Sequence, residues 1–282
     1  MKKTAIITGA DGGMGTEITR AVAQAGYRII MLCYTASKGE ERKKQLILET
    51  GNTDIEMVRI DLSSMESVTK VAETLKEKVT SLDLLMNNAG TMATHYTQTD
   101  DGFERTVAVN YLAPFLLTRK LIPLMHKGSR IVNMVSCTYA IGKVGPNFFE
   151  KGTEGSFWRI PIYSNTKFAL WLFTRQLALE LKDKGITVNA ADPGIVSTNI
   201  ISMHMWFDPL TDLLFRPLIR TPRQGADTAI RLLLNSEYEG KTGGMYASGK
   251  KRKLKTKYIN HPQMESLWKT TEQKLVEKGY KI

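Results

Sequence analysis

Residues 4–15 read TAIITGADGGMG, and this stretch decides the fold. It begins as a short apolar strand, Ala5 to Ile7, turns through several glycines, and enters a segment, Thr16 to Ala25, with a helical pattern. Glycines at such a turn adopt backbone angles that other residues resist, and they let phosphates approach the N–H groups at the helix start. We therefore expect a dinucleotide-binding turn, although a loop that only needs positive φ would look similar.

The spacing of the glycines leaves two patterns open. Gly9, Gly13 and Gly15 fit TGxxxGxG, whereas Gly9, Gly12 and Gly15 fit TGxxGxxG. Both are glycine-rich turns of the dinucleotide-binding kind, so the turn alone does not choose between them. The rest of the chain must decide.

The composition is that of an ordinary globular protein. The chain has 282 residues, 42% hydrophobic and 24% charged, which is enough for one large α/β domain with a substantial core. No run approaches the roughly 18 apolar residues of a membrane span, and the N-terminus lacks the apolar region of a signal peptide. Cys33 and Cys137 have no CxxC or His/Cys cluster around them, so we expect reduced thiols, no metal site and a cytoplasmic protein.

The net charge of +11 and the basic run from Lys250 to Lys257 raise the question of a nucleic-acid partner. No nucleic-acid motif accompanies the run, and no amphipathic membrane-surface pattern passes through it. We expect a solvated tail or edge segment here, within a basic C-terminal segment 250–282, and no nucleic-acid partner. Attraction of an acidic partner remains open.

Strand-like and helix-like segments alternate with short connections along the chain. This alternation predicts a single α/β domain over residues 1–282, a Rossmann-type doubly wound parallel sheet covered on both faces. Further strands are expected at 28–33, 55–60, 82–86 and 130–135, and further helices at 39–49, 63–79, 103–125 and 163–184.

A candidate catalytic pair, Tyr163 and Lys167, opens the last of these helices. Residues four apart lie on one helix face, and a lysine cation beside a tyrosine favours the phenolate, which makes the hydroxyl a better base at neutral pH. The YxxxK spacing often arises by chance, but Ser136 ends a predicted strand nearby. Ligands bind outside the carboxyl ends of parallel strands, where the glycine turn, Asn88 to Gly90 and Pro193-Gly194 should also meet.

In this combination the chain resembles the short-chain dehydrogenase/reductase family over nearly its whole length. The resemblance rests on TGADGGMG, Asp61-Leu62, NNAG at 87–90, Asn110, Ser136, Tyr163xxxLys167 and PGIVST at 193–198, in the family's order and approximate spacing. The compact length, NNAG and TGxxxGxG favour the dehydrogenases and reductases over the epimerase-like branch. Within that group the chain looks most like the retinol dehydrogenase-like enzymes, on stretches such as CYTASKGEERKK, VNYLAPFLLT and FRPLIRTPRQGADTAIRLLL.

The resemblance implies an NAD(P)-dependent oxidoreductase that moves a hydride between nicotinamide C4 and an alcohol or carbonyl carbon. Tyr163 would be the general acid and base, Ser136 would hydrogen-bond the substrate oxygen, and Asn110 would position a water in the proton relay. Lys167 would bind the nicotinamide ribose and lower the Tyr163 pKa. The implied cofactor-binding residues are Gly9, Gly13, Met14, Gly15, Asp61, Leu62, Asn88, Ala89, Gly90, Tyr163, Lys167, Pro193, Ile195 and Thr198.

The end of the second strand bears on the choice between NAD and NADP. No carboxylate follows Cys33, and Lys38, near the hydroxyl of Tyr34, could hold the 2′-phosphate of NADP. Asp11 would be mildly repulsive if it faced that phosphate, and Tyr34 stands where retinol dehydrogenase-like enzymes often carry an arginine. We include Asp11, Tyr34 and Lys38 in the cofactor site and expect a slight preference for NADP(H) over NAD(H).

Two segments, about 138–162 and 200–220, are predicted to shape the substrate pocket. Their apolar side chains indicate a hydrophobic alcohol or carbonyl substrate, and such loops are candidate lids, although core packing or a subunit contact would also explain them. These side chains are Phe148, Phe149, Phe157 and Trp158 in the first segment, and Met203, Met205, Trp206, Phe207, Leu213, Leu214 and Phe215 in the second. The alternative function is a cofactor-binding sensor or scaffold without turnover; a homodimer and a homotetramer are both open.

Overall fold

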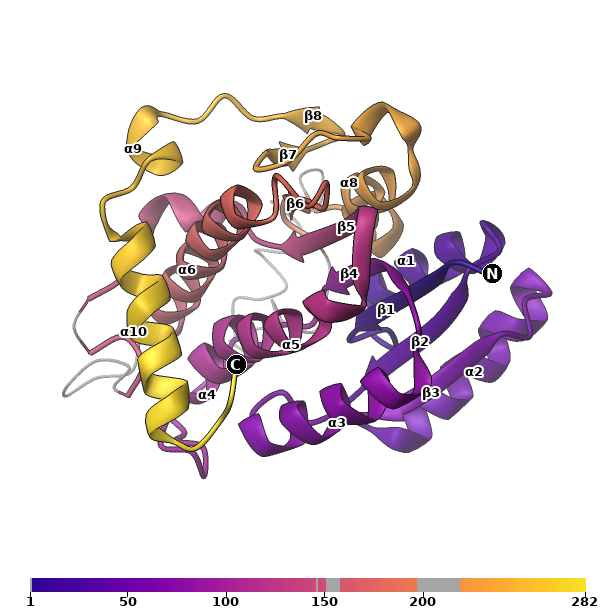
Figure 1. Ribbon diagram of the computed structural model, residues 1–282, viewed down its shortest axis with the longest axis horizontal. Coiled ribbons are helices and arrows are strands. Elements are labelled where there is room, and N and C mark those ends of the chain that lie inside the picture. The colour runs from indigo at the N-terminus through magenta and orange to yellow at the C-terminus, as the bar shows by residue number, and fades with distance from the viewer. Residues whose placement is uncertain (1, 146, 151–157, 197–218) are drawn as a thin grey trace.

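One parallel sheet organises the molecule. The computed structural model describes residues 2–145, 147–150, 158–196 and 219–282, and within them the strand order is β3-β2-β1-β4-β5-β6-β7-β8 (Figure 1). Only the pair β7–β8 is antiparallel among these described strands. The strands are β1 Thr4–Thr8, β2 Arg28–Cys33, β3 Ile55–Arg59, β4 Leu82–Asn87, β5 Met125–Met134, β6 Thr187–Asp192, β7 Met245–Ala247 and β8 Lys250–Lys251.

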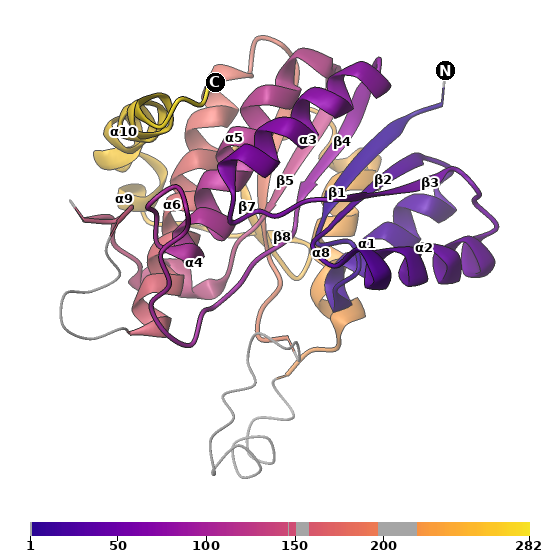
Figure 2. The ribbon, with the colours of Figure 1, turned by 90° about the horizontal axis from the view of Figure 1, so that it is seen from below.

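Helices cover both faces of the sheet, as Figure 2 shows. One apolar core lies between the sheet and α3, α5 and α6, and the other lies between the sheet and α1, α2 and α8. The helices are α1 Gly13–Gln24, α2 Ala36–Thr50, α3 Met65–Lys78, α4 Arg105–Val107, α5 Ala113–Leu121, α6 Arg159–Glu180, α8 Pro222–Leu234, α9 Thr256–Ile259 and α10 Gln263–Glu277. The predicted doubly wound parallel sheet is confirmed.

The sheet is buried on both faces because its central strands are apolar at every position. In β1, Ile6 faces the first core while Ala5 and Ile7 face the second, and all three are at most 1% exposed. Alternate side chains of a strand point to opposite faces, so a doubly covered strand reads as an unbroken apolar run. The strand order reverses between β1 and β4, which places the ligand crevice at their carboxyl ends.

The predicted helix at 103–125 is interrupted. It begins as α4, passes through a π turn at Ala108–Leu112, continues as α5 and ends in a 3-10 turn at Ile122–Leu124. Pro114 has no N–H to donate to the carbonyl of Asn110, and its ring crowds that carbonyl. The N–H of Ala113 bonds instead to the carbonyl of Ala108, five residues back, which is the π pattern.

Other boundaries differ by a few residues from those predicted. α6 begins at Arg159, four residues before Tyr163, so the tyrosine lies in the second turn and not at the helix start. α2 begins at Ala36 instead of 39, and β5 begins at Met125 instead of 130. The predicted cap Ser64 does begin α3, where its Oγ accepts from the N–H of Ser67.

The C-terminal residues pack onto the domain. In α10, Trp268 lies 4.9 Å from the ring of Phe115 and 5.7 Å from that of Phe173, centroid to centroid, and the Tyr111 and Thr271 hydroxyls are 2.7 Å apart. Within the basic run, Lys250 and Lys251 form the exposed edge strand β8. No helix in the described part of the chain is long and apolar enough to cross a membrane, and no group of three metal-ligating side chains occurs there.

Candidate active site

The glycine turn joins the carboxyl end of β1 to α1. Gly9 has a φ of +60°, in the left-handed region that favours glycine. A Cβ on Gly15 would lie 1.9 Å from the carbonyl oxygen of Gly9, so the turn closes only with glycine at position 15. A Cβ on Gly13 would meet only the side chain of Pro222, at 3.3 Å, so the fold demands less of this glycine.

The start of α1 fits an anionic ligand. Its N-cap, Gly12, has no side chain to cap the helix, and the first turn contains no acidic residue. The leading N–H groups of a helix lack intrahelical partners, and the helix dipole favours negative charge at that end. The residues of the turn therefore fit the pyrophosphate of a dinucleotide.

Asn88 ties the turn to the end of β4. Its Nδ2 donates to the carbonyl oxygens of Thr8 and Gly9 at 3.0 and 3.1 Å, and Thr8 Oγ1 accepts from the N–H groups of Asn88 and Ala89 at 3.0 Å each. The Asn88 Oδ1 is buried and accepts no hydrogen bond within the described residues. A buried acceptor normally has a donor, so a ligand hydroxyl fits this position.

Residues predicted to select the cofactor gather at the end of β2. Burial, followed by the adjacent carboxylate of Asp11, raises the pKa of the Cys33 thiol to about 12, so Asp11 does lie at this strand end. Tyr34, Asp61 and Leu62 line one small cavity of about 140 Å³. Lys38 is exposed in the first turn of α2.

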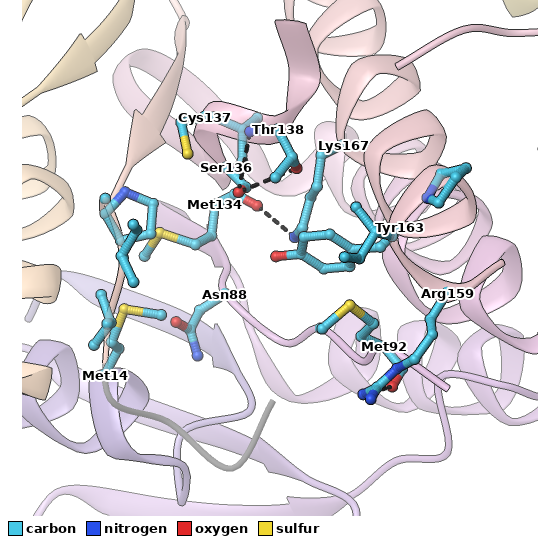
Figure 3. Close-up of a pocket in the computed structure, with 18 of the residues that line it drawn as sticks. Met14, Asn88, Met92, Met134, Ser136, Cys137, Thr138, Arg159, Tyr163 and Lys167 are labelled. Carbon is cyan, nitrogen blue, oxygen red and sulfur yellow. Dashed lines mark hydrogen bonds between the residues drawn. The ribbon is translucent and has the colours of Figure 1, made fainter. Parts of the chain in front are cut away.

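Tyr163 and Lys167 project from α6 toward Ser136, which follows β5 (Figure 3). Lys167 Nζ lies 5.5 Å from the centroid of the Tyr163 ring and donates to the carbonyl oxygen of Met134 at 2.8 Å. Ser136 Oγ accepts from the hydroxyl of Thr138 at 3.2 Å. The structure thus brings the three predicted catalytic side chains together.

Burial dominates the titration of this pair. It raises the pKa of Tyr163 to about 12, although a hydrogen bond with Ser136 opposes the shift, and it lowers the pKa of Lys167 to about 8. The Tyr163 pKa therefore lies above its usual value, whereas we expected Lys167 to lower it. Desolvation penalises the phenolate more than the lysine stabilises it, so the tyrosine is protonated at neutral pH and able to donate a proton.

Asn110 lies in the π turn and is fully buried. Its Nδ2 donates to the carbonyl of Thr91 at 2.8 Å and to Thr166 Oγ1 at 3.1 Å, and its Oδ1 accepts from the N–H of Thr91 at 2.7 Å. Thr166 Oγ1 in turn donates to the carbonyl of Tyr163 at 2.7 Å. A hydrogen-bonded chain therefore connects Asn110 to the backbone that carries the tyrosine.

The loop after β6 forms another part of the site. Pro193, Gly194 and Ile195 line the same cavity as Ser136. The loop is held by Asp192, fully buried, whose Oδ1 accepts from the N–H of Gly194 at 3.0 Å. The predicted Thr198 lies outside the described residues.

The cavity that these elements enclose has a volume of about 540 Å³. Its lining is mostly apolar, and the catalytic candidates lie on its wall. The described lining residues are Met14, Asn88, Gly90, Met92, Met134, Val135, Ser136, Cys137, Thr138, Trp158, Arg159, Ile160, Pro161, Tyr163, Lys167, Pro193, Gly194, Ile195 and Val196.

The prediction for residues 138–162 is only partly right. Trp158 lines the cavity, but Phe148 and Phe149 are 7% and 4% exposed and pack edge-on to each other and against Tyr111 in the core. Sequence does not tell a core aromatic from a pocket aromatic, because both are apolar. Phe157 and residues 200–218 lie outside the described part of the chain.

Two charged residues of the site were missed by reasoning from the sequence. Arg159 lines the cavity, one helical turn before Tyr163, a spacing of four residues that could have identified it. Arg252, in the basic run, pairs with the buried Asp192 at 3.0 Å (Nη2 to Oδ2), and no local signal links residues 60 apart in the sequence.

Comparisons with known proteins agree with this geometry. The pattern of the short chain dehydrogenase family matches residues 3–204. The chain is 35% identical to retinol dehydrogenase 14 of Mus musculus, over 96% of this chain and 85% of the relative.

Solved structures share the fold. A crystal structure of a protein from Mycobacterium paratuberculosis superposes with a TM-score of 0.76 at 25% identity, covering 96% of this chain and 92% of that one. A blue fluorescent protein from a metagenomic library, solved in complex with NADPH, gives a TM-score of 0.69 at 26% identity over 87% of this chain and 95% of that one.

Proposed function

Because the chain belongs to the short-chain dehydrogenase/reductase family, we propose that it transfers a hydride between nicotinamide C4 and a hydrophobic alcohol or carbonyl substrate, with Tyr163 as general acid and base. Membership of the family makes it an oxidoreductase that acts on CH–OH or C=O groups with a nicotinamide cofactor. The observation that carries the finer proposal is the convergence of Ser136, Tyr163 and Lys167 on one mostly apolar cavity.

The cofactor would lie along the edge from the glycine turn to the Pro193–Ile195 loop. The N–H groups at the start of α1 would hold the pyrophosphate, and Asn88 Oδ1 would accept from a sugar hydroxyl. When bound, the cofactor supplies or accepts the hydride. Contacts of Thr198 with the nicotinamide amide stay a prediction.

Tyr163 would move the proton. Its raised pKa keeps the hydroxyl protonated at neutral pH, so it can donate to the oxygen of a carbonyl substrate that Ser136 also hydrogen-bonds. In the oxidative direction the same oxygen would accept the alcohol proton, which requires the Lys167 charge nearby to stabilise the phenolate. Asn110 would position a water behind this pair, through its chain of hydrogen bonds to Thr91 and Thr166.

NADP(H) remains slightly preferred in this proposal. The lack of a carboxylate directly after Cys33, the exposed Lys38 nearby and the NADPH complex of the similar blue fluorescent protein support it. Asp11 at the end of β2 argues the other way. A cytoplasmic location and a homodimer or homotetramer also stay predictions.

The proposal is tested in two steps. Purified protein is titrated calorimetrically with NADPH and with NADH; micromolar or tighter binding of one of them is expected, and binding of neither would contradict the proposal. Aldehyde reduction is then measured for Tyr163→Phe, which keeps the ring but removes the acid, so turnover should fall by about 100-fold or more with cofactor affinity unchanged. Cofactor binding without turnover in the wild type would favour the sensor alternative.

A further inference from the structure

Arg159 is a cation in the wall of the catalytic cavity. It is the first residue of α6 and stands four residues before Tyr163, as Lys167 stands four after it, so the three share one face of the helix. Figure 3 shows its side chain beside Met92, with Tyr163 on the same side of the cavity.

The protein leaves this guanidinium poorly paired. Its Nη2 donates to the carbonyl oxygen of Met92 at 3.4 Å, a long hydrogen bond, and its Nε is buried without a hydrogen-bond partner. No carboxylate among the described residues lies within ion-pair distance of it. A buried N–H of a charged group that lacks an acceptor is costly, so a partner from outside the chain would be favoured.

The cavity has an excess of positive charge. Its described lining contains two cations, Arg159 and Lys167, and no Asp or Glu, among side chains that are mostly apolar. Apolar walls lower the local dielectric constant, so a positive charge attracts an anion more strongly there than at the surface. The first turn of α6 also has no acidic residue and no side-chain cap, which adds the positive end of its dipole.

We infer that Arg159 recognises an anionic group of the substrate, best matched by a carboxylate, on an otherwise apolar alcohol or carbonyl compound. A guanidinium binds a carboxylate in a planar, two-bonded arrangement that a lysine does not reproduce. The anionic group would lie about one helical turn, roughly 5.4 Å along α6, from the oxygen that Tyr163 protonates. This inference rests on the proposed function, and it excludes a wholly neutral substrate as the best one.

The phosphates of the cofactor are the competing anions. They would bind at the glycine turn, where Met14 lies, and in Figure 3 Met14 and Arg159 lie on opposite sides of the cavity. Arg159 neighbours Met92 instead, two residues beyond Gly90. The experiment therefore has to separate cofactor affinity from substrate affinity.

The test compares acids with their neutral esters. Two pairs are used, 4-formylbenzoate with methyl 4-formylbenzoate, and 12-oxododecanoate with its methyl ester. Each is titrated into the complex of the protein with its preferred oxidised cofactor, so that binding is measured without turnover, and kcat/KM for reduction is measured separately. The wild type should bind at least one acid about tenfold more tightly than its ester, the size expected of a charge-assisted hydrogen bond.

Three variants complete the design. Arg159→Met should abolish the preference for the acid while leaving ester binding and cofactor affinity unchanged, and Arg159→Lys should keep part of it. Arg42→Met, an arginine of α2 that bonds only to Gln45 in the described structure, is the matched control and should behave as the wild type. Thermal melting by circular dichroism checks that each variant is folded.

Each outcome decides. Equal binding of acid and ester in both pairs, or no binding of either, would overturn the inference, as would an Arg159→Met variant that loses acid and ester affinity alike. A loss of cofactor affinity in Arg159→Met would assign the residue to the cofactor site instead. Failure of the wild type to bind either cofactor would sink the proposed function itself, which is a different result from a missing charge preference.

Discussion

Gly15 shows how a single hydrogen atom in place of a side chain can make a site. Its position is fixed by the carbonyl oxygen of Gly9, which a Cβ would approach to 1.9 Å. Gly15→Ala should therefore lower the free energy of unfolding by about 1–3 kcal/mol and weaken cofactor binding, because the turn must open to admit the methyl group. Urea unfolding and cofactor titration measure the two effects.

Gly12 is the matched control for that substitution. Its φ of −76° suits any residue, and the nearest atom to a Cβ there lies at 3.4 Å. Gly12→Ala should change the unfolding free energy by less than about 0.5 kcal/mol. Equal destabilisation by both substitutions would mean that the close approach to Gly9 is not the reason for the glycine at position 15.

Lys167 should make cofactor binding depend on pH. Burial lowers its pKa to about 8, and an anionic cofactor beside it would raise that pKa again in the complex. Between the two pKa values binding takes up a proton, so affinity is full below about pH 8 and falls by up to about tenfold per pH unit above it. Calorimetric titrations from pH 6.5 to 9.5 measure this, and Lys167→Met should give a flat profile. A flat profile in the wild type would contradict the prediction.

At the scale of elements, the π turn around Asn110 depends on Pro114. An alanine at 114 would supply the missing N–H to the Asn110 carbonyl and allow a regular α-helix, which would rotate Asn110 relative to Thr91 and Thr166. Pro114→Ala should therefore be at least as stable as the wild type but turn over substrate more slowly, by about tenfold, the lower range for disturbing a proton relay.

Pro123 supplies the control for this helix. It lies in the 3-10 turn Ile122–Leu124, outside the residues that line the cavity within the described chain. Pro123→Ala should leave kcat unchanged. Undiminished turnover in Pro114→Ala would mean that the hydrogen bonds of Asn110 hold its position without help from the proline.

The elements that sequence predicts well are those whose pattern is local. RIIMLC becomes β2 because a strand covered on both faces is apolar throughout, and Ser64 begins α3 because its hydroxyl caps the first turn. The π turn was missed because Pro114 near a helix start usually causes no distortion. Phe148 and Phe149 were misplaced because only tertiary packing separates a core aromatic from a pocket aromatic.

The same distinction applies to the site. Gly9, Ser136, Tyr163 and Lys167 converge as expected, because the carboxyl ends of parallel strands share one edge. The Tyr163 pKa moved opposite to expectation, since burial is a property of the folded chain and not of the spacing between residues. The ion pair between Asp192 and Arg252 could not be predicted, because it depends on how β8 lies against β7.

At the scale of the whole molecule, the basic run is part of the domain and reaches the active site. Arg252 follows the edge strand β8, and its N–H bonds to the carbonyl of Met245 in β7 at 2.8 Å. Its guanidinium pairs with Asp192, whose other oxygen holds the N–H of Gly194 in the cavity wall. The chain's C-terminal third therefore helps to set the loop proposed to hold the nicotinamide.

Arg252→Ala should weaken both the fold and cofactor binding. The Asp192 side chain is fully buried, so removing its partner leaves a carboxylate without a counter-charge in the interior. Breaking a fully buried pair costs about 3–5 kcal/mol, but the Arg252 side chain is 44% exposed and water can partly replace it, so we expect about 2 kcal/mol. Urea unfolding measures the loss, and cofactor titration should show weaker binding because Gly194 is no longer held. Lys253→Ala, which removes an exposed charge from the same run, should do neither; if it matches Arg252→Ala, net charge and not the ion pair with Asp192 is what matters.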